Sequence, residues 1–378
     1  MNVLHVTPSI SRKYGGPTYS LAAYSRASLA AGVQNTILSS QADVADDWLT
    51  STLPEVEVHM FRNYGRGALF AVPGLHSWLR RNGEKFDVVH VHGLLNPVSS
   101  FAASACVRRG WPLIIRPFGT MSRYTYGHRR TAIKRAYSTL VDVPNLRHAS
   151  AIHFTTKVER DESAWRGLSW DDRAFVIAPP WIADQARGQR ELRRDRRTVL
   201  FLSRLHPVKC LDLLLDAWPF VQQSVLNAEL LIAGDGDGPY VNEMRARAVS
   251  IGTSIRMVGH VEGAEKRAVI AQADLFVLPS AHENFGIAVL EAIAAGLPVV
   301  VTPEVQLSPF VVEHKLGFVA QRSAQALAAS IVRALGDAEL NDRCREHGAE
   351  IVAECFSLRS VGESLADMYR FAVAHPPA

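Results

Sequence analysis

The sequence predicts an α/β protein built from two doubly wound domains, each with a parallel sheet covered by helices on both faces. Short runs rich in Val, Ile and Leu alternate with helical patterns along the whole chain, and such runs are typical of strands buried on both faces. The chain has 378 residues, which is too many for one ordinary core. A polar, Arg-rich segment at residues 179–197 separates two series of strands. We therefore expect two domains.

Each series of strands has its own first strand, so each can form a separate sheet. In the first half we expect strands at Val3–Val6, Thr36–Leu38, Val56–Met60, Val88–His92, Leu113–Ile115, Ala151–Thr155 and Val176–Ala178. In the second half we expect them at Val199–Ser203, Ala228–Ala233, Ile255–Val258, Leu275–Pro279, Val299–Thr302 and Phe318–Ala320. We place the N-terminal domain at residues 1–183 and the C-terminal domain at 184–358. A last helix within residues 359–378 could return to the first domain.

The composition is that of a globular protein, with 48% hydrophobic and 21% charged residues. The four cysteines are scattered along the chain, as expected for reduced core thiols. No stretch approaches about 18 consecutive apolar residues, and the N-terminus goes straight into a strand without a basic segment. We therefore expect no transmembrane helix and no secretion signal, and a cytoplasmic location.

The charge is unevenly divided between the two halves. Residues 1–185 hold 21 Lys/Arg and 14 Asp/Glu, whereas residues 186–378 hold 20 and 23. The basic excess of the first half is either an ordinary solvated surface or one that attracts anionic lipid headgroups or a pyrophosphate-bearing acceptor. The second interpretation would bring the protein to the inner face of the plasma membrane. Nucleic acid is not expected as a partner, because basic and aromatic residues do not interleave and no known nucleic-acid module is present.

Two cations follow the first expected strand of the second half. Arg204 and Lys209 flank a Pro-containing loop at the carboxyl end of a strand, where doubly wound folds bind ligands. Arg can place two N–H groups on phosphate oxygens, and Lys acts as a compact charge. The next strand ends in a Gly-rich turn that begins at Gly234. Its Asp-x-Asp spacing would suit a divalent metal, but the glycines favour a turn near a phosphate. A weaker pattern around Val261 could frame a flat base.

The most informative pair is Glu283 and Glu291, which span a polar loop and the start of a short helix. Their eight-residue spacing gives a separation on the order of 10 Å, about the length of a nucleotide diphospho-sugar from ribose to hexose. The free N–H groups of the helix N-terminus, near Phe285, lie between them and form a ready diphosphate site. The two carboxylates would then accept hydrogen bonds from sugar and ribose hydroxyls. The apolar neighbours of Glu291 disfavour an exposed position for it.

Glycines and histidines mark the corresponding edge of the first half. Gly15 and Gly16 follow the first strand and would let the backbone approach a ligand, although a tight turn without a ligand explains them equally well. They do not form GxGxxG, so the dinucleotide fingerprint is absent. His90 and His92 share one face of a strand. His92 is nearer the carboxyl end and could reach a ligand between the domains, whereas His90 is better explained as structural.

In this order of motifs the chain resembles the large retaining GT4 family of glycosyltransferases. These have the GT-B fold, in which two Rossmann-like domains face each other across a cleft. The resemblance spans nearly the full length and is strongest at residues 198–319. It implies that Arg204 and Lys209 bind the donor diphosphate and stabilise the leaving group. It also implies that Glu283 contacts the transferred sugar and that Glu291 contacts the ribose.

The resemblance also assigns residues through their backbone and on the acceptor side. Those near the donor sugar and phosphate would be Asn284, Phe285 and Gly286, and those lining the acceptor side of the cleft would be Gly15 and Gly16. Several relatives carry a donor-contacting His after the strand at Leu113–Ile115. Here Gly119 stands about where that His would fall, in a segment that starts at Arg116. That role is lost or passes to His92 or to backbone. The Arg-Pro-x-Gly-x-Met-Ser pattern of this segment also occurs in relatives that build exopolysaccharides.

The resemblance implies transfer of a hexosyl group from a nucleotide diphospho-sugar to a carbohydrate or lipid-linked acceptor, with the anomeric configuration retained. We expect no metal and no other cofactor, because cations and a helix N-terminus can stabilise the departing diphosphate. Three alternatives stay open. They are a nucleotide-sugar epimerase of the same fold, a phosphorylase or sugar-phosphate synthase with a soluble acceptor, and a sugar-nucleotide-binding protein without catalysis.

Overall fold

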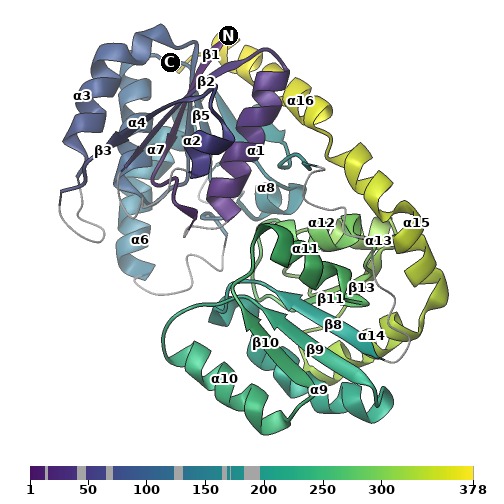
Figure 1. Ribbon diagram of the computed structural model, residues 1–378. Helices are drawn as coiled ribbons and strands as arrows, with labels where there is room; N and C mark the ends of the chain where they lie inside the picture. The colour runs from purple at the N-terminus through teal and green to yellow at the C-terminus, as the bar shows by residue number, and fades with distance from the viewer. Residues whose placement is uncertain are drawn as a thin grey trace. The chain divides into compact units, whose positions relative to one another are not determined.

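The computed structural model describes residues 1–12, 16–40, 48–64, 71–122, 131–163, 168–170, 172–182 and 196–377. The chain divides into two compact units (Figure 1). Unit 1 comprises Met1–Pro180 and Phe356–Ala378, and unit 2 comprises Trp181–Cys355. Both junctions lie three residues before the boundaries predicted from the sequence. The last helix of the chain is part of unit 1.

Unit 1 is built on a seven-stranded parallel sheet with strand order β3-β2-β1-β4-β5-β6-β7. The strands are β1 (Asn2–Thr7), β2 (Gln34–Ser40), β3 (Glu57–Phe61), β4 (Val88–His92), β5 (Leu113–Arg116), β6 (Ala151–Phe154) and β7 (Ala174–Val176). The predicted α/β architecture is confirmed here. Among these strands, only β7 is clearly offset from its predicted position. It begins and ends two residues before the expected strand.

Helices cover both faces of this sheet (Figure 1). On one face, α1 (Gly16–Ala30) and α16 (Leu358–Ala374) share a buried cluster with the sheet. These two helices approach closely, since a Cβ on Gly362 would lie 2.3 Å from the carbonyl oxygen of Ala27. The other face is covered by α3 (Pro73–Asn82), α4 (Pro97–Arg109) and α7 (Val143–His148). Shorter elements are α2 (Trp48–Thr52), η3 (Gly83–Lys85), α6 (Thr131–Tyr137), η4 (Ser138–Asp142) and α8 (Lys157–Ser163).

Unit 2 has a six-stranded parallel sheet with strand order β10-β9-β8-β11-β12-β13. The strands are β8 (Arg197–Leu202), β9 (Ala228–Ala233), β10 (Ile255–Gly259), β11 (Leu275–Leu278), β12 (Val299–Val301) and β13 (Gly317–Val319). The helices are α9 (Leu211–Ser224), α10 (Pro239–Ile251), α11 (Gly263–Ala271), α12 (Ile287–Ala294), α13 (Ser308–Glu313), α14 (Ala324–Gly336) and α15 (Ala338–Cys355), with a 3-10 turn η6 (Pro207–Lys209). Among the described residues of both units, no helix is long and apolar enough to cross a bilayer.

The strand orders identify where each unit can bind a ligand. In unit 2 the chain runs outward from β8 through β9 to β10, and then resumes on the other side of β8 with β11. Unit 1 reverses in the same way between β1 and β4. In doubly wound sheets, ligands bind beyond the carboxyl ends of the strands at such a reversal. The loops that follow β8 and β11 are therefore the first place to look in unit 2.

Candidate active site

Two loops meet at the reversal point of unit 2. The loop after β8 carries Arg204, which is exposed, and Lys209, which is half-buried at the end of η6. The loop after β11 runs alongside it, since the N–H of Ala281 donates to the carbonyl oxygen of Val208 at 2.8 Å. The two cations predicted from the sequence therefore stand on one side of the reversal, and the Glu283 loop stands on the other.

The Gly-rich turn after β9 packs directly against the Arg204 loop. A Cβ on Gly234 would lie 1.9 Å from the carbonyl oxygen of Ser203, and one on Gly236 would lie 2.5 Å from that of Leu205. Both glycines are thus required by close backbone approach. The N–H of Gly234 donates to the carbonyl oxygen of Gly259 at 2.7 Å, so it is already engaged within the fold.

The Asp-x-Asp spacing in this turn has a structural explanation. Asp235 accepts a hydrogen bond from the N–H of Gly236 at 2.8 Å and pairs with Arg245 at 2.8 Å. Asp237 is exposed. Val261, the residue expected near the base, is half-buried in the loop between β10 and α11.

Lys209 and Glu283 form an ion pair across the reversal point. Their side chains are 15% and 19% exposed, so the pair is partly shielded from water but open to a ligand. Glu283 lies in the loop and not on the helix, because α12 begins only at Ile287. Its backbone is held by neighbouring loop residues, since its N–H donates to the carbonyl oxygen of Glu304 at 3.0 Å. The sequence predicted both residues but not their contact.

The N-terminus of α12 is left without a side-chain cap. Its N-cap is Gly286, which has φ 91° and offers no side chain. A Cβ at this position would lie 3.2 Å from Cγ2 of Val289 and 3.4 Å from Cγ of Glu283, so glycine is required by both conformation and space. Phe285 is buried just before it. Uncapped N–H groups and the positive end of the helix dipole are suited to a phosphate.

Glu291 is buried on α12, with 4% exposure, in agreement with its apolar neighbours. One carboxylate oxygen, Oε1, accepts a hydrogen bond from Nζ of Lys266 at 2.5 Å. The other, Oε2, is buried with no partner among the described residues. Lys266 comes from α11 and was not predicted from the sequence. This ion pair holds the Glu291 side chain in an enclosed position with one oxygen available.

Several buried polar atoms near this edge have no hydrogen-bond partner among the described residues. They are Ser280 Oγ, Asn284 Oδ1, Glu291 Oε2 and Glu304 Oε2. Buried polar groups in native proteins are nearly always paired, because leaving one unpaired costs about 1–3 kcal/mol. All four atoms come from one stretch of 25 residues, 280–304. The same edge carries two cations and an uncapped helix N-terminus. Together these features indicate a site that a polar ligand completes.

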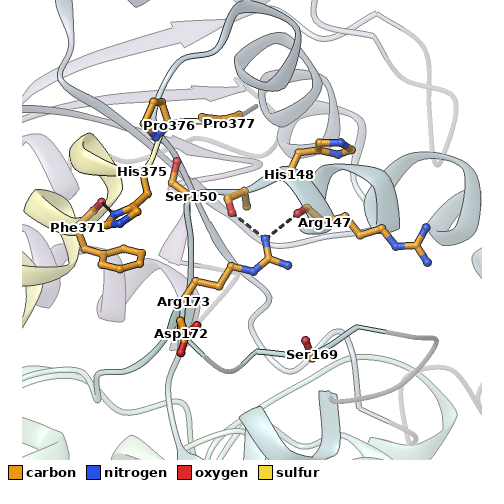
Figure 2. Close-up of a pocket in the computed structure, with 11 residues that line it drawn as sticks. Arg147, His148, Ser150, Ser169, Asp172, Arg173, Phe371, His375, Pro376 and Pro377 are labelled. Atoms are coloured by element: carbon orange, nitrogen blue, oxygen red, sulfur yellow. Dashed lines mark hydrogen bonds between the residues drawn. The ribbon is translucent and has the colours of Figure 1, made fainter.

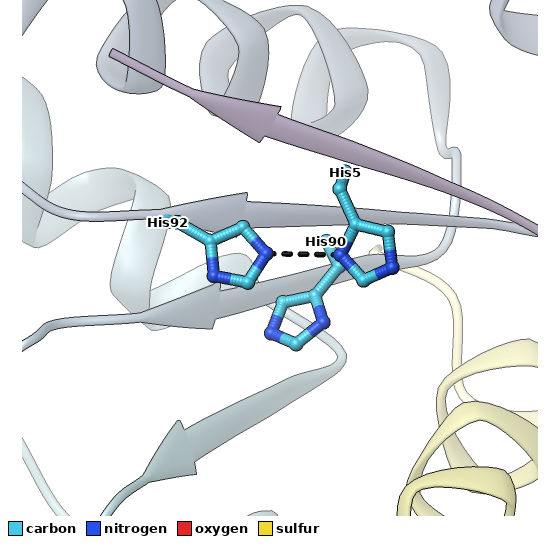
Figure 3. Close-up of side chains that lie close together, drawn as sticks. All are labelled: His5, His90 and His92. Carbon is cyan, nitrogen blue, oxygen red and sulfur yellow. Dashed lines mark hydrogen bonds between the residues drawn. The ribbon is translucent and has the colours of Figure 1, made fainter. Parts of the chain in front are cut away.

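At the reversal point of unit 1, His92 is enclosed by the fold. It is 1% exposed, so it does not present the open position that the sequence suggested. Its Nε2 lies 3.0 Å from Nδ1 of His5 (Figure 3). Nε2 of His5 in turn lies 2.9 Å from Oδ1 of Asn35. The amide oxygen of Asn35 can only accept, so the hydrogen of His5 is on Nε2 and His92 donates to His5. Nδ1 of His92 is then an acceptor, and it has no partner among the described residues.

A second histidine pair lies beside the first. His153 Nε2 is 2.9 Å from the carbonyl oxygen of Ile177, and His153 Nδ1 is 3.3 Å from Nε2 of His90. His153 must therefore donate to Ile177 and accept from His90. His90 Nδ1 in turn lies 3.3 Å from the hydroxyl of Tyr369 on α16. His90 is thus structural, as expected, and both pairs hold neutral rings.

Three of these histidines could also be considered as metal ligands. Ring nitrogens of His5, His90 and His92 lie within 4.8 Å of one another (Figure 3). The hydrogen bonds already use both nitrogens of His5 and His90. A metal would have to displace them, so the cluster is better explained as a buried hydrogen-bond network.

Arg116 is also buried, with 1% exposure. Its guanidinium lies between two rings, 4.4 Å from the centroid of Tyr24 and 3.8 Å from that of Phe118. Burial lowers its pKa, but arginine stays charged at neutral pH. Phe118 has φ 59°, an uncommon conformation for a bulky residue, and it covers Arg116. The sequence did not single out Phe118.

The remaining residues predicted for the acceptor side are three glycines. Gly119 has φ 68°, and its N–H donates to Oε1 of the buried Glu159 at 2.5 Å. Glu159, another residue that the sequence did not suggest, thus fixes the loop after β5. Gly16 begins α1, and a Cβ there would meet nothing within 4 Å. Gly15 lies outside the described residues.

A surface cavity of about 400 Å³ lies elsewhere on unit 1 (Figure 2). It is lined by the end of α7, the start of β7 and the C-terminal tail. Arg173 in its wall donates through Nη1 to the carbonyl oxygens of Arg147 and Ala149, at 2.8 and 2.9 Å, and so caps the end of α7. The cavity lies at the amino ends of β6 and β7, opposite the ligand edge. We do not assign it to the reaction.

Comparisons with known proteins agree with this architecture. Residues 183–351 match the family model of the glycosyl transferases group 1, and residues 15–181 match that of the glycosyl transferase 4-like domain. The chain belongs to the GT4 glycosyltransferases, which have the GT-B fold. The two matches together span nearly all of the chain.

Individual relatives and solved structures support the same assignment. The chain is 36% identical over 159 residues to a phosphatidyl-myo-inositol mannosyltransferase of Mycobacterium leprae, covering 41% of this chain and 42% of that protein. It is 26% identical over 331 residues to a D-inositol 3-phosphate glycosyltransferase of Corynebacterium glutamicum, covering 80% and 76%. It thus spans less than half the length of the mannosyltransferase.

Solved structures show the same fold at low sequence identity. Anabaena HepE in complex with UDP and glucose has a TM-score of 0.76 and 18% identity, covering 98% of this chain and 99% of that one. Sucrose-phosphate synthase from Thermosynechococcus elongatus has a TM-score of 0.76 and 17% identity, covering 99% of each chain.

Proposed function

We propose that this protein transfers a hexosyl group from a nucleotide diphospho-sugar to an acceptor hydroxyl, with retention of configuration, in polysaccharide or glycolipid assembly. The observation that carries the proposal is the set of unpartnered buried oxygens around Asn284 and Glu291, beside two cations and an uncapped helix. A ligand with many hydroxyls and a diphosphate would supply what these groups lack. The UDP complex of HepE supports a nucleotide as part of that ligand.

The chemistry follows from what each group does as the glycosidic bond to phosphate breaks. Negative charge builds up on the departing diphosphate, and Arg204, Lys209 and the α12 N-terminus stabilise it most strongly at that moment. The Lys209–Glu283 pair would open when phosphate replaces the carboxylate on Lys209. Glu283 would then be free to accept hydrogen bonds from the transferred sugar. In this proposal the leaving phosphate accepts the acceptor's proton on the same face, and no metal or other cofactor takes part.

The acceptor would be a carbohydrate or a lipid-linked glycan bound by unit 1. The net positive charge of residues 1–185 suits a pyrophosphate-bearing acceptor at the inner face of the plasma membrane. The mannosyltransferase relative is named for a phosphatidyl-inositol acceptor, which is consistent with a lipid-linked substrate here.

The proposal is tested first by nucleotide binding. We expect one of UDP, GDP and ADP to raise the melting temperature, because a ligand that binds only the folded state stabilises it. Glu291→Gln should weaken that shift without lowering the melting temperature of the free protein by a comparable amount. Product analysis with donor alone is the companion experiment. Formation of an isomer of the donor sugar without acceptor would indicate an epimerase and reject transfer.

Lys266 offers a second prediction, because it holds Glu291 through Oε1. Lys266→Met should reduce nucleotide affinity about tenfold or more, the value of a charge-assisted hydrogen bond. The physical reason is that Glu291 loses the ion pair that holds its carboxylate in place, so it is less well oriented to accept ribose hydroxyls. Isothermal titration with the nucleotide and with its 2′,3′-dideoxy analogue measures this.

The deoxy analogue provides the internal control. The loss on Lys266→Met should be confined to the ribonucleotide, and Lys266→Arg should retain most of the affinity. An equal loss for both nucleotides would mean that Lys266 acts on the fold and not on Glu291.

A further inference from the structure

One helical segment of unit 1 has an inward face that is fixed by polar contacts. Residues 131–148 run without interruption through α6, one π-helical turn (η4) and α7. Asp142, which is buried in the π turn, accepts a hydrogen bond from Ser100 at 2.7 Å and one from the N–H of Leu95 at 3.0 Å. Asn145 donates to the carbonyl oxygen of Ser100 at 3.1 Å. These contacts to α4 and to the loop after β4 determine which side of the segment faces outward.

The outward side is apolar where a surface helix is ordinarily polar. Ile133 is 64% exposed and Leu140 is 76% exposed, and Ala136 between them is exposed as well. Their spacing of three, four and seven residues places them on one stripe. On α4, which covers the same face of the sheet, Phe101 is 53% exposed. None of these side chains belongs to the two buried clusters that flank the sheet, and Phe101 contacts the ring of His76 on α3, with 4.5 Å between the ring centroids.

The sequence around this stripe is rich in cations. Residues 88–141 contain eight Lys/Arg and no Asp/Glu, although Arg116 is buried and the three arginines within 123–130 lie outside the described residues. Lys134 and Arg135 lie within the stripe's own helix, and Arg108 is exposed on α4. A mixed surface would be expected of an ordinary solvated face. Apolar side chains flanked by cations are instead the pattern that binds a bilayer interface, with the apolar groups among the lipids and the cations at anionic headgroups.

The stripe also begins at the functional edge of unit 1. The segment follows the loop after β5, so its first turn lies toward the carboxyl ends of the strands and its last turn toward their amino ends. The carboxyl ends are also where His92 and Arg116 lie. A bilayer that contacts Ile133 would therefore lie at the edge of the sheet where an acceptor is expected.

We propose that Phe101, Ile133, Lys134, Arg135 and Leu140 form a docking surface for an anionic lipid bilayer. This proposal rests on the proposed function in one respect, namely that a lipid carries the acceptor. Apolar contact and cationic attraction are both required, because either alone gives only weak and reversible membrane binding. The basic composition makes a bilayer the favoured occupant, and a second copy of this chain would be repelled by the same charge.

The test is co-sedimentation of the purified full chain with vesicles. We expect binding to phosphatidylcholine vesicles that contain phosphatidylglycerol, little binding to phosphatidylcholine alone, and a decrease as salt rises. The double variant Ile133→Ser, Leu140→Ser should lower the partition coefficient about tenfold or more. Lys134→Glu with Arg135→Glu should lower it by a similar factor, from the loss and reversal of two charges.

Matched control variants on unit 2 test whether vesicle binding depends on this surface or on any exposed apolar or charged residue. Leu226 and Val249 are 90% and 81% exposed on unit 2, and changing both to Ser should leave vesicle binding unchanged. Arg343→Glu with Arg345→Glu on α15 should change it little. No binding to anionic vesicles, or an equal loss in these controls, would overturn the proposal. So would a dimer, seen by sedimentation velocity, that Ile133→Ser, Leu140→Ser abolishes.

The outcome of the vesicle-binding test does not depend on whether the proposed reaction is correct. Nucleotide-induced thermal shifts should be the same in the docking-surface variants and in the unchanged protein. Vesicle binding without any nucleotide binding would reject the transferase proposal and leave the docking surface intact. Nucleotide binding without vesicle binding would reject the docking surface and leave the transferase proposal intact.

Discussion

Replacing Lys209 with alanine should lower the rate of donor turnover by about 10²–10³-fold. The ammonium group is half-buried at the reversal point of unit 2 and already pairs with a carboxylate, so it is held in place before a ligand arrives. A group positioned in advance stabilises developing charge without the cost of reorganisation. The effect should appear in kcat more than in KM, because the charge on the diphosphate is greatest as the bond breaks. Initial rates of nucleotide release at saturating donor and acceptor measure it.

The companion variants separate catalysis from folding. Arg204→Ala should also slow turnover, whereas Arg343→Ala on α15 should not. Lys209→Ala leaves Glu283 without its cation, so the melting temperature and turnover of Lys209→Ala, Glu283→Gln should be compared with those of the single variants. An unchanged rate in Lys209→Ala, with the protein folded, would remove the electrostatic role that we assign to it.

The parts of the site that depend on strand order could be predicted from the sequence. Continuous Val, Ile and Leu runs identify parallel strands because both faces of such strands are buried. The residues directly after a run, such as Arg204 after β8 and Gly234 after β9, must then lie at the carboxyl edge. The position predicted for the short β7 was two residues too far along the chain. Its three residues are only half-buried, so they leave a weak hydrophobic pattern in the sequence.

The parts that depend on pairing between distant segments could not be predicted. Lys266 reaches Glu291 from α11, and nothing in the local pattern of either helix indicates the other. His92 appeared to be a ligand candidate because its position on β4 faces the carboxyl edge. Its partner His5 is 87 residues away. Local periodicity gives the face on which a side chain lies, and only the packed sheet gives its neighbours.

The π turn at Asp142 is a further example. Ile133, Ala136 and Leu140 follow helical spacing in the sequence, but they face outward and not into the core. The inward face of this segment is held by two hydrogen bonds that Asp142 accepts, from Ser100 on α4 and from the loop before α4, and by one that Asn145 donates to Ser100. Polar anchoring of this kind leaves no hydrophobic signal, and it permits the apolar residues to face outward.

Unit 1 should lose stability steeply as the pH falls below 6.5, because four buried histidines are neutral in the folded state. Burial lowers the pKa of His5 to about 4 and lowers the pKa values of His90, His92 and His153 well below 6.5. The cation of Arg116 acts in the same direction on all four. In the unfolded chain these rings regain their ordinary pKa, so the unfolded state binds more protons below pH 6.5.

The sign and size of the effect follow from this difference in proton binding. Stability is fully present well above pH 6.5 and is lost as the pH falls through that value, with each histidine contributing on the order of 1 kcal/mol between pH 7.5 and 5.5. Four together contribute several kcal/mol, which is comparable to the whole stability of many domains. Burial raises the pKa of Asp142 to about 6, and this acts in the opposite direction. It offsets about 1 kcal/mol, because the folded state then takes up a proton in that range.

Urea unfolding at a series of pH values measures this dependence. The free energy of unfolding of unit 1 should fall by several kcal/mol from about pH 7.5 to about pH 5.5, and tryptophan fluorescence of unit 1, through Trp111 and Trp170, can follow it. His260 is exposed on unit 2, and His260→Asn should leave the dependence unchanged. His153→Gln should flatten it, since one ring no longer takes up a proton on unfolding. A free energy that stays level over this range would mean that the four rings are already protonated in the fold, and the hydrogen-bond directions assigned to both pairs would then be wrong.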